Sequence, residues 1–152
     1  MTTDYTTAPL DHGRVLVTTS FSMPFGFPAL DGLPFQERKR LGVAIGRFQA
    51  PSQPLENFYG RTLYIAGMIQ HPAELTDKES GELKPCVRTV FLLDTGDCIS
   101  SPSDAVNRFA QQLVAICGTP ELGLWEEVIP IKVLPQKTQA GRTTFALSMV
   151  EE

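Results

Sequence analysis

The chain has few of the residues on which disulfide frameworks and metal sites depend. It holds two histidines and three cysteines among its 152 residues. The cysteines, Cys86, Cys98 and Cys117, form no CxxC pair, so they predict neither a zinc site nor a disulfide framework. Reduced, mostly packed thiols are typical of a cytoplasmic protein. No apolar run approaches the ~20 residues that a membrane helix needs, and the first residues show no secretory pattern.

Catalytic motifs are missing as well. A nucleophile needs a base and a group that orients the base, but His12 and His71 lie near loops or prolines with no Ser–His–Asp or Cys–His pattern. The chain has no GxxxxGK[ST] phosphate loop. Asp94 and Asp97 flank a turn glycine, where carboxylates are more often turn formers than metal ligands. We therefore expect no enzyme, no cofactor and no metal, although a small enzyme with an unrecognised site stays open.

Charge is distributed unevenly along the chain. The net charge of -4 argues against coating of duplex DNA by bulk charge, but it leaves room for a local basic groove. Residues 128–150 contain Lys132, Lys137 and Arg142 and no acidic residue. A second basic stretch, relieved only by Glu56, consists of Arg38, Lys39, Arg40, Arg47 and Arg61.

The first part of the chain differs from the rest, and we divide the chain into an N-terminal extension (1–58) and a domain (59–152). Residues 14–19 are strand-like, and residues 21–35 alternate Phe, Pro and Gly, which predicts a turn-rich loop. The phenylalanines of this loop either dock on the domain or form an interface. Gly42 and Gly46 make a stable helix over residues 41–48 doubtful, and residues 50–54 indicate a further loop.

The domain has a mainly β pattern with one helix. Strands are predicted over residues 59–70, 86–93, 98–100, 128–134 and 142–150. A helix capped by Ser103 and ended by Gly118 carries an apolar stripe at spacings of three and four. This order is typical of the five-stranded OB-fold barrel with a helix between strands 3 and 4. An α+β domain with a helix on an antiparallel sheet also fits it.

Strand alternation sorts the side chains into inward and outward sets. If Leu63, Ile65 and Ile69 fill the barrel, Tyr64 points outward and can stack on a base. If the barrel takes Phe91, Arg88 points outward and can contact a phosphate. Phe145 is more often core than surface in this position.

Two runs carry a resemblance to a family. LYIAGMIQHPAELTDKESGELKPCVRTVFLLDTGDCIS and WEEVIPIKVLPQKTQAGRTTFALSMV resemble the first three strands and the closing hairpin of OB-fold single-stranded DNA-binding proteins. The resemblance covers residues 59–150, concerns architecture, and is greatest to small replication or recombination proteins of phages and mobile elements. It implies sequence-tolerant binding that protects or organises single-stranded DNA in the cytoplasm, or in the host cytoplasm for a phage protein. Its implied partners are single-stranded DNA, further copies of the chain, and replication or recombination proteins, with no membrane.

A single-strand binder needs cations for phosphates and aromatic rings for bases. The expected interface consists of Tyr64, Arg88, Lys132, Lys137, Arg142, Trp125, Arg47 and Phe48. A lone Trp packs in a core somewhat more often than it stacks on a base, so a packing role for Trp125 stays open. A preference for DNA or RNA is not readable, because it depends on placed donors and acceptors. The alternative is a non-catalytic assembly module that uses the Phe/Pro-rich segment, which the net charge favours.

Overall fold

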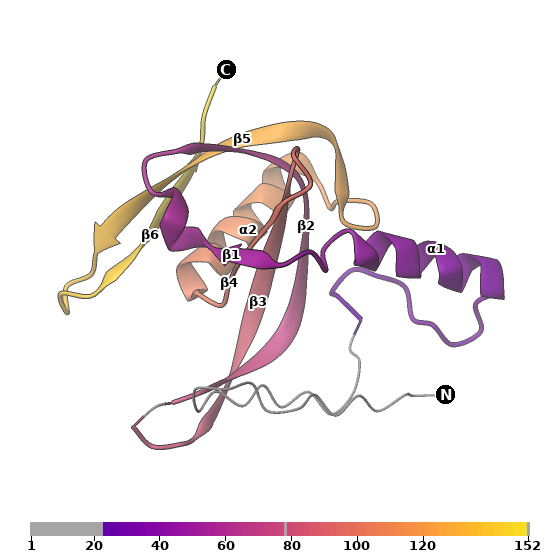
Figure 1. Ribbon diagram of the computed structural model, residues 1–152, viewed down its shortest axis with the longest axis horizontal. Coiled ribbons are helices and arrows are strands. Elements are labelled where there is room, and N and C mark those ends of the chain that lie inside the picture. The colour runs from indigo at the N-terminus through magenta and orange to yellow at the C-terminus, as the bar shows by residue number, and fades with distance from the viewer. Residues whose placement is uncertain (1–22, 78, 152) are drawn as a thin grey trace.

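The computed structural model describes residues 23–77 and 79–151, which contain one curled six-stranded sheet and two α-helices (Figure 1). The helices are α1 (Phe35–Gly46) and α2 (Asp104–Cys117), with a short 3₁₀ helix η1 (Leu55–Phe58). The strands are β1 (Ser52–Pro54), β2 (Thr62–Thr76), β3 (Leu83–Leu93), β4 (Cys98–Ser101), β5 (Leu124–Lys137) and β6 (Thr143–Met149). Their order in the sheet is β1-β4-β3-β2-β5-β6, an open half-barrel with β1 and β6 at its edges.

Strand β2 is the central strand, and it changes partners along its length. Its first part pairs with β5, and nearly the whole strand pairs antiparallel with β3. Both ladders shift register between Ile65 and Gly67, which marks a bulge. Because of this shift, Met68 joins Ile65 in the main core, whereas Ile69 lies in a second cluster. The expectation that Ile69 shares the barrel face with Leu63 is therefore wrong.

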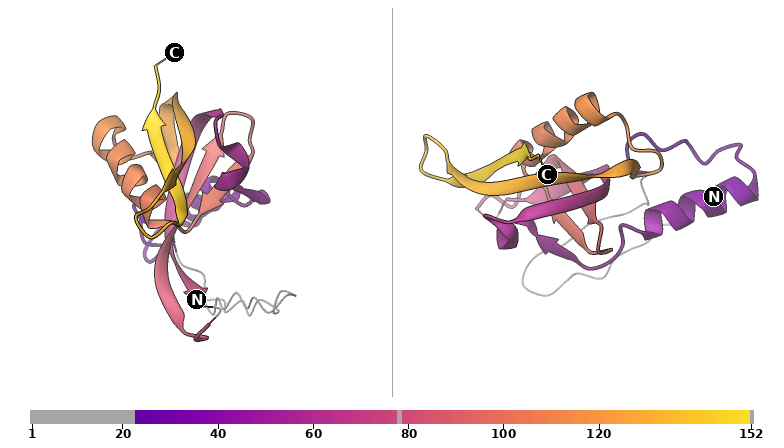
Figure 2. Two further views of the ribbon diagram at one scale, coloured as in Figure 1. Left: turned by 90° about the vertical axis from the view of Figure 1, so that its left-hand side faces the viewer. Right: turned by 90° about the horizontal axis from the view of Figure 1, so that it is seen from above.

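The inner face of the sheet packs against α2, which lies along one side of the strands (Figure 2). Ser103 caps this helix by accepting a hydrogen bond from the Ala105 N–H at 3.2 Å, and Gly118 with φ 87° ends it. Val106, Phe109, Ala110 and Leu113 are buried in the main core, as their spacing predicted. The core also includes Phe91, Ile131, Val133 and Phe145.

The outer face carries a smaller apolar cluster over β2, β3 and β4. Its buried members are Phe48, Ile69, Val90, Leu92 and Cys98, and Phe27 and Leu124 pack against them. Phe48 directly follows α1, and Phe27 belongs to the Phe/Pro-rich segment. Part of that segment therefore docks on this cluster.

Two segments of the expected extension differ from the prediction. The sheet has six strands instead of five, because Ser52–Pro54 pairs in parallel with β4 where a loop was predicted. Leu55 and Phe58 of η1 are buried in the main core, so the sheet and core begin before the boundary expected at residue 59.

A helix forms where glycines made one doubtful. Helix α1 extends away from the sheet and buries Leu41 and Ala44 (Figure 1). A Cβ added at Gly42 or Gly46 would meet no atom of another part of the chain within 4 Å. The turn-rich course of the preceding loop is confirmed from Met23 onward. The strand expected over residues 14–19, and His12, lie outside the described residues. Within the described ranges, no helix has the length and apolar character to cross a membrane.

Candidate nucleic-acid interface

Tyr64 and Lys132 lie on the same outer face of the β2–β5 ladder. Tyr64 pairs with Pro130, and Thr62 pairs with Lys132, so the two side chains are diagonal neighbours within reach of each other. The Tyr64 side chain is 37% exposed, and Lys132 is half-buried. Tyr64 precedes the bulge, where β2 directs Leu63 and Ile65 into the core and Tyr64 to the outer face, as the alternation predicted.

The β5–β6 hairpin carries two further cations toward its turn. Lys137 pairs with Thr143 at the end of the ladder, and Arg142 lies in the turn, where its backbone N–H donates to Thr138 Oγ1 at 3.2 Å. Both cationic side chains are exposed. Lys132 and Lys137 are five residues apart on one strand, or roughly 17 Å, and strand alternation directs their side chains to opposite faces of it. We call Tyr64, Lys132, Lys137 and Arg142 the hairpin surface.

Arg88 also lies on the outer face, but it is half-buried among polar neighbours. Its Nη1 lies 3.1 Å from His71 Nε2, and its Nη2 donates to Ser52 Oγ and Ser100 Oγ, each at 3.1 Å. Burial lowers the pKa of Arg88. Burial also lowers the pKa of His71, and the positive charge of Arg88 lowers it further. We call Arg88, His71, Ser52 and Ser100 the Arg88 cluster.

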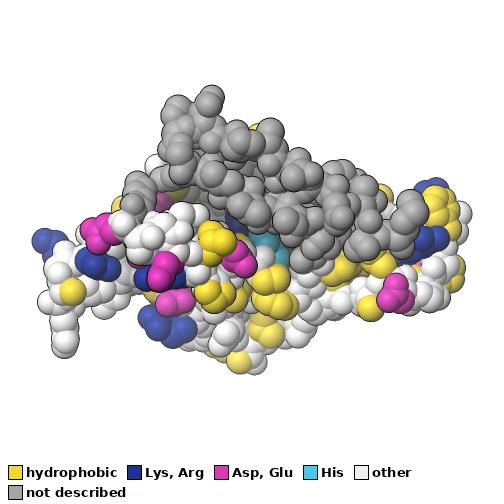
Figure 3. Space-filling model, turned by 90° about the horizontal axis from the view of Figure 1, so that it is seen from below, with side chains coloured by type: hydrophobic (Ala, Val, Ile, Leu, Met, Phe, Trp, Pro, Cys, Tyr) yellow, Lys and Arg dark blue, Asp and Glu magenta, His cyan; other side chains and the backbone are white. Residues whose placement is uncertain are grey.

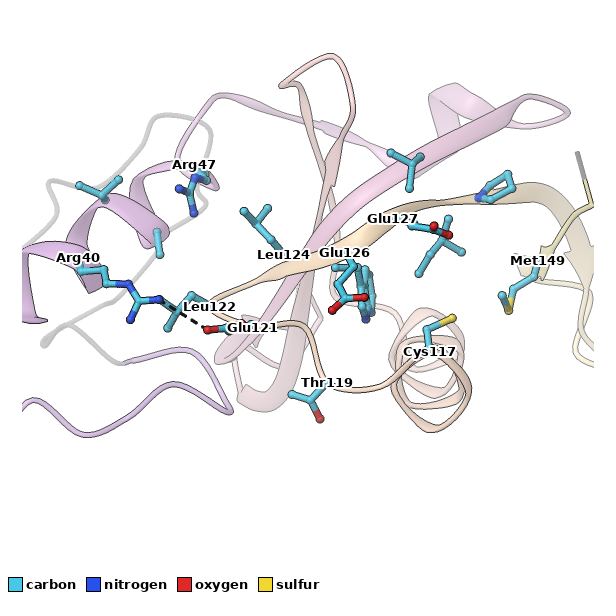
Figure 4. A pocket seen from close by; sticks show the side chains of 16 residues that line it. Arg40, Arg47, Cys117, Thr119, Glu121, Leu122, Leu124, Glu126, Glu127 and Met149 are labelled. Carbon is cyan, nitrogen blue, oxygen red and sulfur yellow. Dashed lines mark ion pairs between the residues drawn. The ribbon is translucent and has the colours of Figure 1, made fainter.

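Arg47 and Trp125 line a cavity of about 1050 Å³ between α1, β5 and the end of α2 (Figure 4). The indole Nε1–H of Trp125 donates to the Gly118 carbonyl at 2.8 Å, which ties the ring to the end of α2. Three carboxylates, Glu121, Glu126 and Glu127, share this lining, and Glu121 lies 3.6 Å from Arg40. These carboxylates would repel a phosphate, so the cavity lacks the positively charged lining that the expected interface requires.

Phe48 cannot take the stacking role expected of it. Its side chain is 5% exposed and belongs to the outer apolar cluster, where its ring lies against Gly123. The sequence pattern missed this because the packing partners come from β2, β3, β4 and the turn before β5.

Three members of the Arg88 cluster escaped the sequence reasoning. The predicted strand ends at residue 70, but β2 continues through His71 and Pro72 and pairs His71 with Arg88. The alternation Ile69–His71–Ala73 was the available signal for this continuation. Nothing in the local sequence indicates that Ser52 and Ser100 meet, because they come together only through the β1–β4 pairing.

The described residues contain no group of three or more His, Cys, Asp or Glu side chains placed to hold a metal ion. The structure thus separates the eight expected residues into the hairpin surface, the Arg88 cluster, the mixed-charge cavity and buried Phe48. Comparison of the chain with known protein families, curated proteins and solved structures finds no match.

Proposed function

We propose that the chain binds single-stranded nucleic acid, with single-stranded DNA as its ligand, through the hairpin surface. The observation that carries the proposal is the placement of an aromatic ring on β2 and a cation on β5, Tyr64 and Lys132, as diagonal neighbours. Two more cations, Lys137 and Arg142, lie further along the β5–β6 hairpin. Residues 128–150 include no acid that would repel a phosphate. Stacking on an aromatic ring tolerates any base, and cations that follow the backbone bind without regard to sequence.

The ladder order supports an OB-type barrel as the scaffold. Strands β4-β3-β2-β5-β6, with α2 between β4 and β5, match the expected five strands, and β1 adds a sixth at the β4 edge. In OB-folds the loop between strands 4 and 5 contributes to oligonucleotide binding. If β2 is counted as the first strand of the OB-fold, the loop between strands 4 and 5 is the β5–β6 turn. This turn carries Arg142 and follows Lys137.

The absence of ion pairs at the three cations of the hairpin surface, within the described residues, also supports the proposal. Among the described residues, ion pairs join Arg40 to Glu37 and Glu121, and Lys84 to Asp77. Lys132, Lys137 and Arg142 thus have no carboxylate partner in this part of the chain. Their charges are available to a phosphate backbone without the breaking of an internal ion pair.

The test is fluorescence anisotropy with labelled oligo(dT), oligo(rU) and a duplex of equal length at several salt concentrations. We expect oligo(dT) to bind more tightly than the duplex, with an affinity that falls as salt rises because bound cations are released. The salt slope is the change of log affinity with log salt concentration, and each phosphate contact on a single strand contributes ~0.7 to its magnitude. The triple variant Lys132→Ala, Lys137→Ala, Arg142→Ala removes three contacts and should therefore lower the magnitude of the slope by about 2. Tyr64→Ala should cost about 1–3 kcal/mol of binding free energy, and Tyr64→Phe much less, because the ring is retained.

A charge-matched triple variant is the control. Lys39→Ala, Lys84→Ala, Arg108→Ala removes the same charge from α1, β3 and α2, and it should leave the salt slope nearly unchanged. Equal slopes for the two triple variants would remove the hairpin surface as the site. Absence of binding to any oligonucleotide at micromolar protein would refute the function itself.

Assembly through a second copy of the chain is the second candidate, and exposed apolar side chains favour it. Phe25, Phe35 and Val43 are 55%, 63% and 64% exposed on α1 and the segment before it. Arg38 and Lys39 lie 5.5 and 5.7 Å from the Phe35 ring centre, and basic and apolar side chains gather at this end of the molecule (Figure 3). The two candidates use different surfaces, so both can hold.

A further inference from the structure

The Arg88 cluster is built by four strands that meet on the outer face. Strand β3 supplies Arg88, and the directly paired position of β2 supplies His71. Strands β1 and β4 supply Ser52 and Ser100, whose hydroxyl oxygens lie 2.9 Å apart. The parallel β1–β4 pairing thus brings a residue from before the first long strand into contact with one from the middle of the chain.

Every hydrogen-bond partner of the Arg88 guanidinium among the described residues is neutral. Arg88 makes three hydrogen bonds, to two serine hydroxyls and an imidazole nitrogen. A guanidinium has five N–H donors, so two remain without a partner among the described residues. One of the two serine O–H groups is used in the Ser52–Ser100 hydrogen bond, and the other is left to donate.

The charge of Arg88 has no counterion in the described part of the chain. No carboxylate there lies within 4 Å of it, since the ion pairs involve Arg40 and Lys84. A half-buried cation without an opposite charge is costly, because it loses hydration without gaining an ionic partner. The cluster therefore combines unused donors with an uncompensated positive charge.

We propose that the Arg88 cluster is a binding site for a phosphate-type oxyanion. An N–H group that Arg88 does not use within the cluster can donate a charge-assisted hydrogen bond to such an anion, and the free serine hydroxyl adds a second donor. His71 accepts from Arg88 at Nε2, so its Nδ1 carries the proton, and the ring holds the guanidinium in place. The site is separate from the hairpin surface and does not depend on the proposed function.

The two histidines of the chain make a direct test possible. Ring proton signals of His71 and His12 are assigned by NMR with the variants His71→Gln and His12→Gln. Inorganic phosphate is then titrated against chloride at constant ionic strength. We expect a saturable shift of the His71 signals and a rise in the pKa of His71, because a nearby anion favours the protonated ring.

Two variants separate specific binding from a general salt effect. Arg88→Met should weaken phosphate binding about tenfold or more, while Arg108→Ala on α2 should leave it unchanged. If Arg88→Met does not fold, the double variant Ser52→Ala, Ser100→Ala keeps the guanidinium and should still weaken binding several-fold. No saturable shift in the wild-type chain, or equal affinity in all variants, would overturn the proposal.

A second arm identifies the source of the anion. Oligo(dT) without a terminal phosphate offers only phosphodiesters, so a His71 shift with it supports a site for the nucleic-acid backbone. A shift with inorganic phosphate alone supports a site for free phosphate or a phosphate monoester. Because anisotropy reads oligonucleotide binding separately, failure of the proposed function leaves the phosphate titration interpretable.

Discussion

At Gly67 the backbones of β2 and of the turn before β5 approach so closely that no side chain fits between them. A Cβ at this position would collide with the carbonyl group of Gly123. That carbonyl is fixed, because it accepts a hydrogen bond from the Met68 N–H at 2.8 Å. The bulge that turns the face of β2 thus depends on the absence of a side chain at one residue.

Gly67→Ala should therefore lower the free energy of unfolding by about 1–3 kcal/mol, the usual cost of overpacking a closed site. Urea denaturation followed by circular dichroism measures it. Gly42→Ala in α1 is the matched control: nothing lies within 4 Å of its added Cβ, and alanine is favoured over glycine in a helix by about 0.5–1 kcal/mol. A loss of stability that is the same in both variants would contradict the close approach.

Helix α2 packs against the inner face of the sheet through one of its own faces. Leu113 is fully buried in the main core, whereas Ile116, one turn away, is 60% exposed. Leu113→Ala should lower the free energy of unfolding by about 2–5 kcal/mol, and Ile116→Ala should change it by no more than about 0.5 kcal/mol. Denaturant titration of the two variants provides the comparison, and similar losses would mean that α2 packs through a different face.

Elements with a regular apolar period were predictable from sequence, and those held by distant contacts were not. The stripe through Val106 and Leu113 predicted α2, and alternation predicted Tyr64 on an outward face. Helix α1 escaped because its glycines lower helix propensity. Strand β1 escaped because it has only three residues, the last of which is a proline, and so carries no period. The enclosure of Phe48 and the neighbours of Arg88 depend on strand pairing, which no local pattern encodes.

For the molecule as a whole, the exposed apolar end predicts self-association. Sedimentation velocity should show a mass that rises with protein concentration, because burial of Phe25 and Phe35 between copies removes apolar area from water. The double variant Phe25→Ser, Phe35→Ser should stay monomeric. Leu83→Ser, which removes an equally exposed side chain from β3, should associate like the wild type. A wild-type chain that is monomeric at all concentrations would exclude assembly through this end.

The position of β2 between β3 and β5 has a consequence for how the chain folds. Strands β2, β3 and β4 follow one another through short turns, and so do β5 and β6, so each group can form from local contacts. Among the described strands, the two groups pair with each other only through β2 and β5, as at Thr62 and Lys132, which α2 separates in sequence. Closing a long loop costs chain entropy before its contacts form. That cost therefore falls on the formation of the β2–β5 ladder, which contains Tyr64 and Lys132.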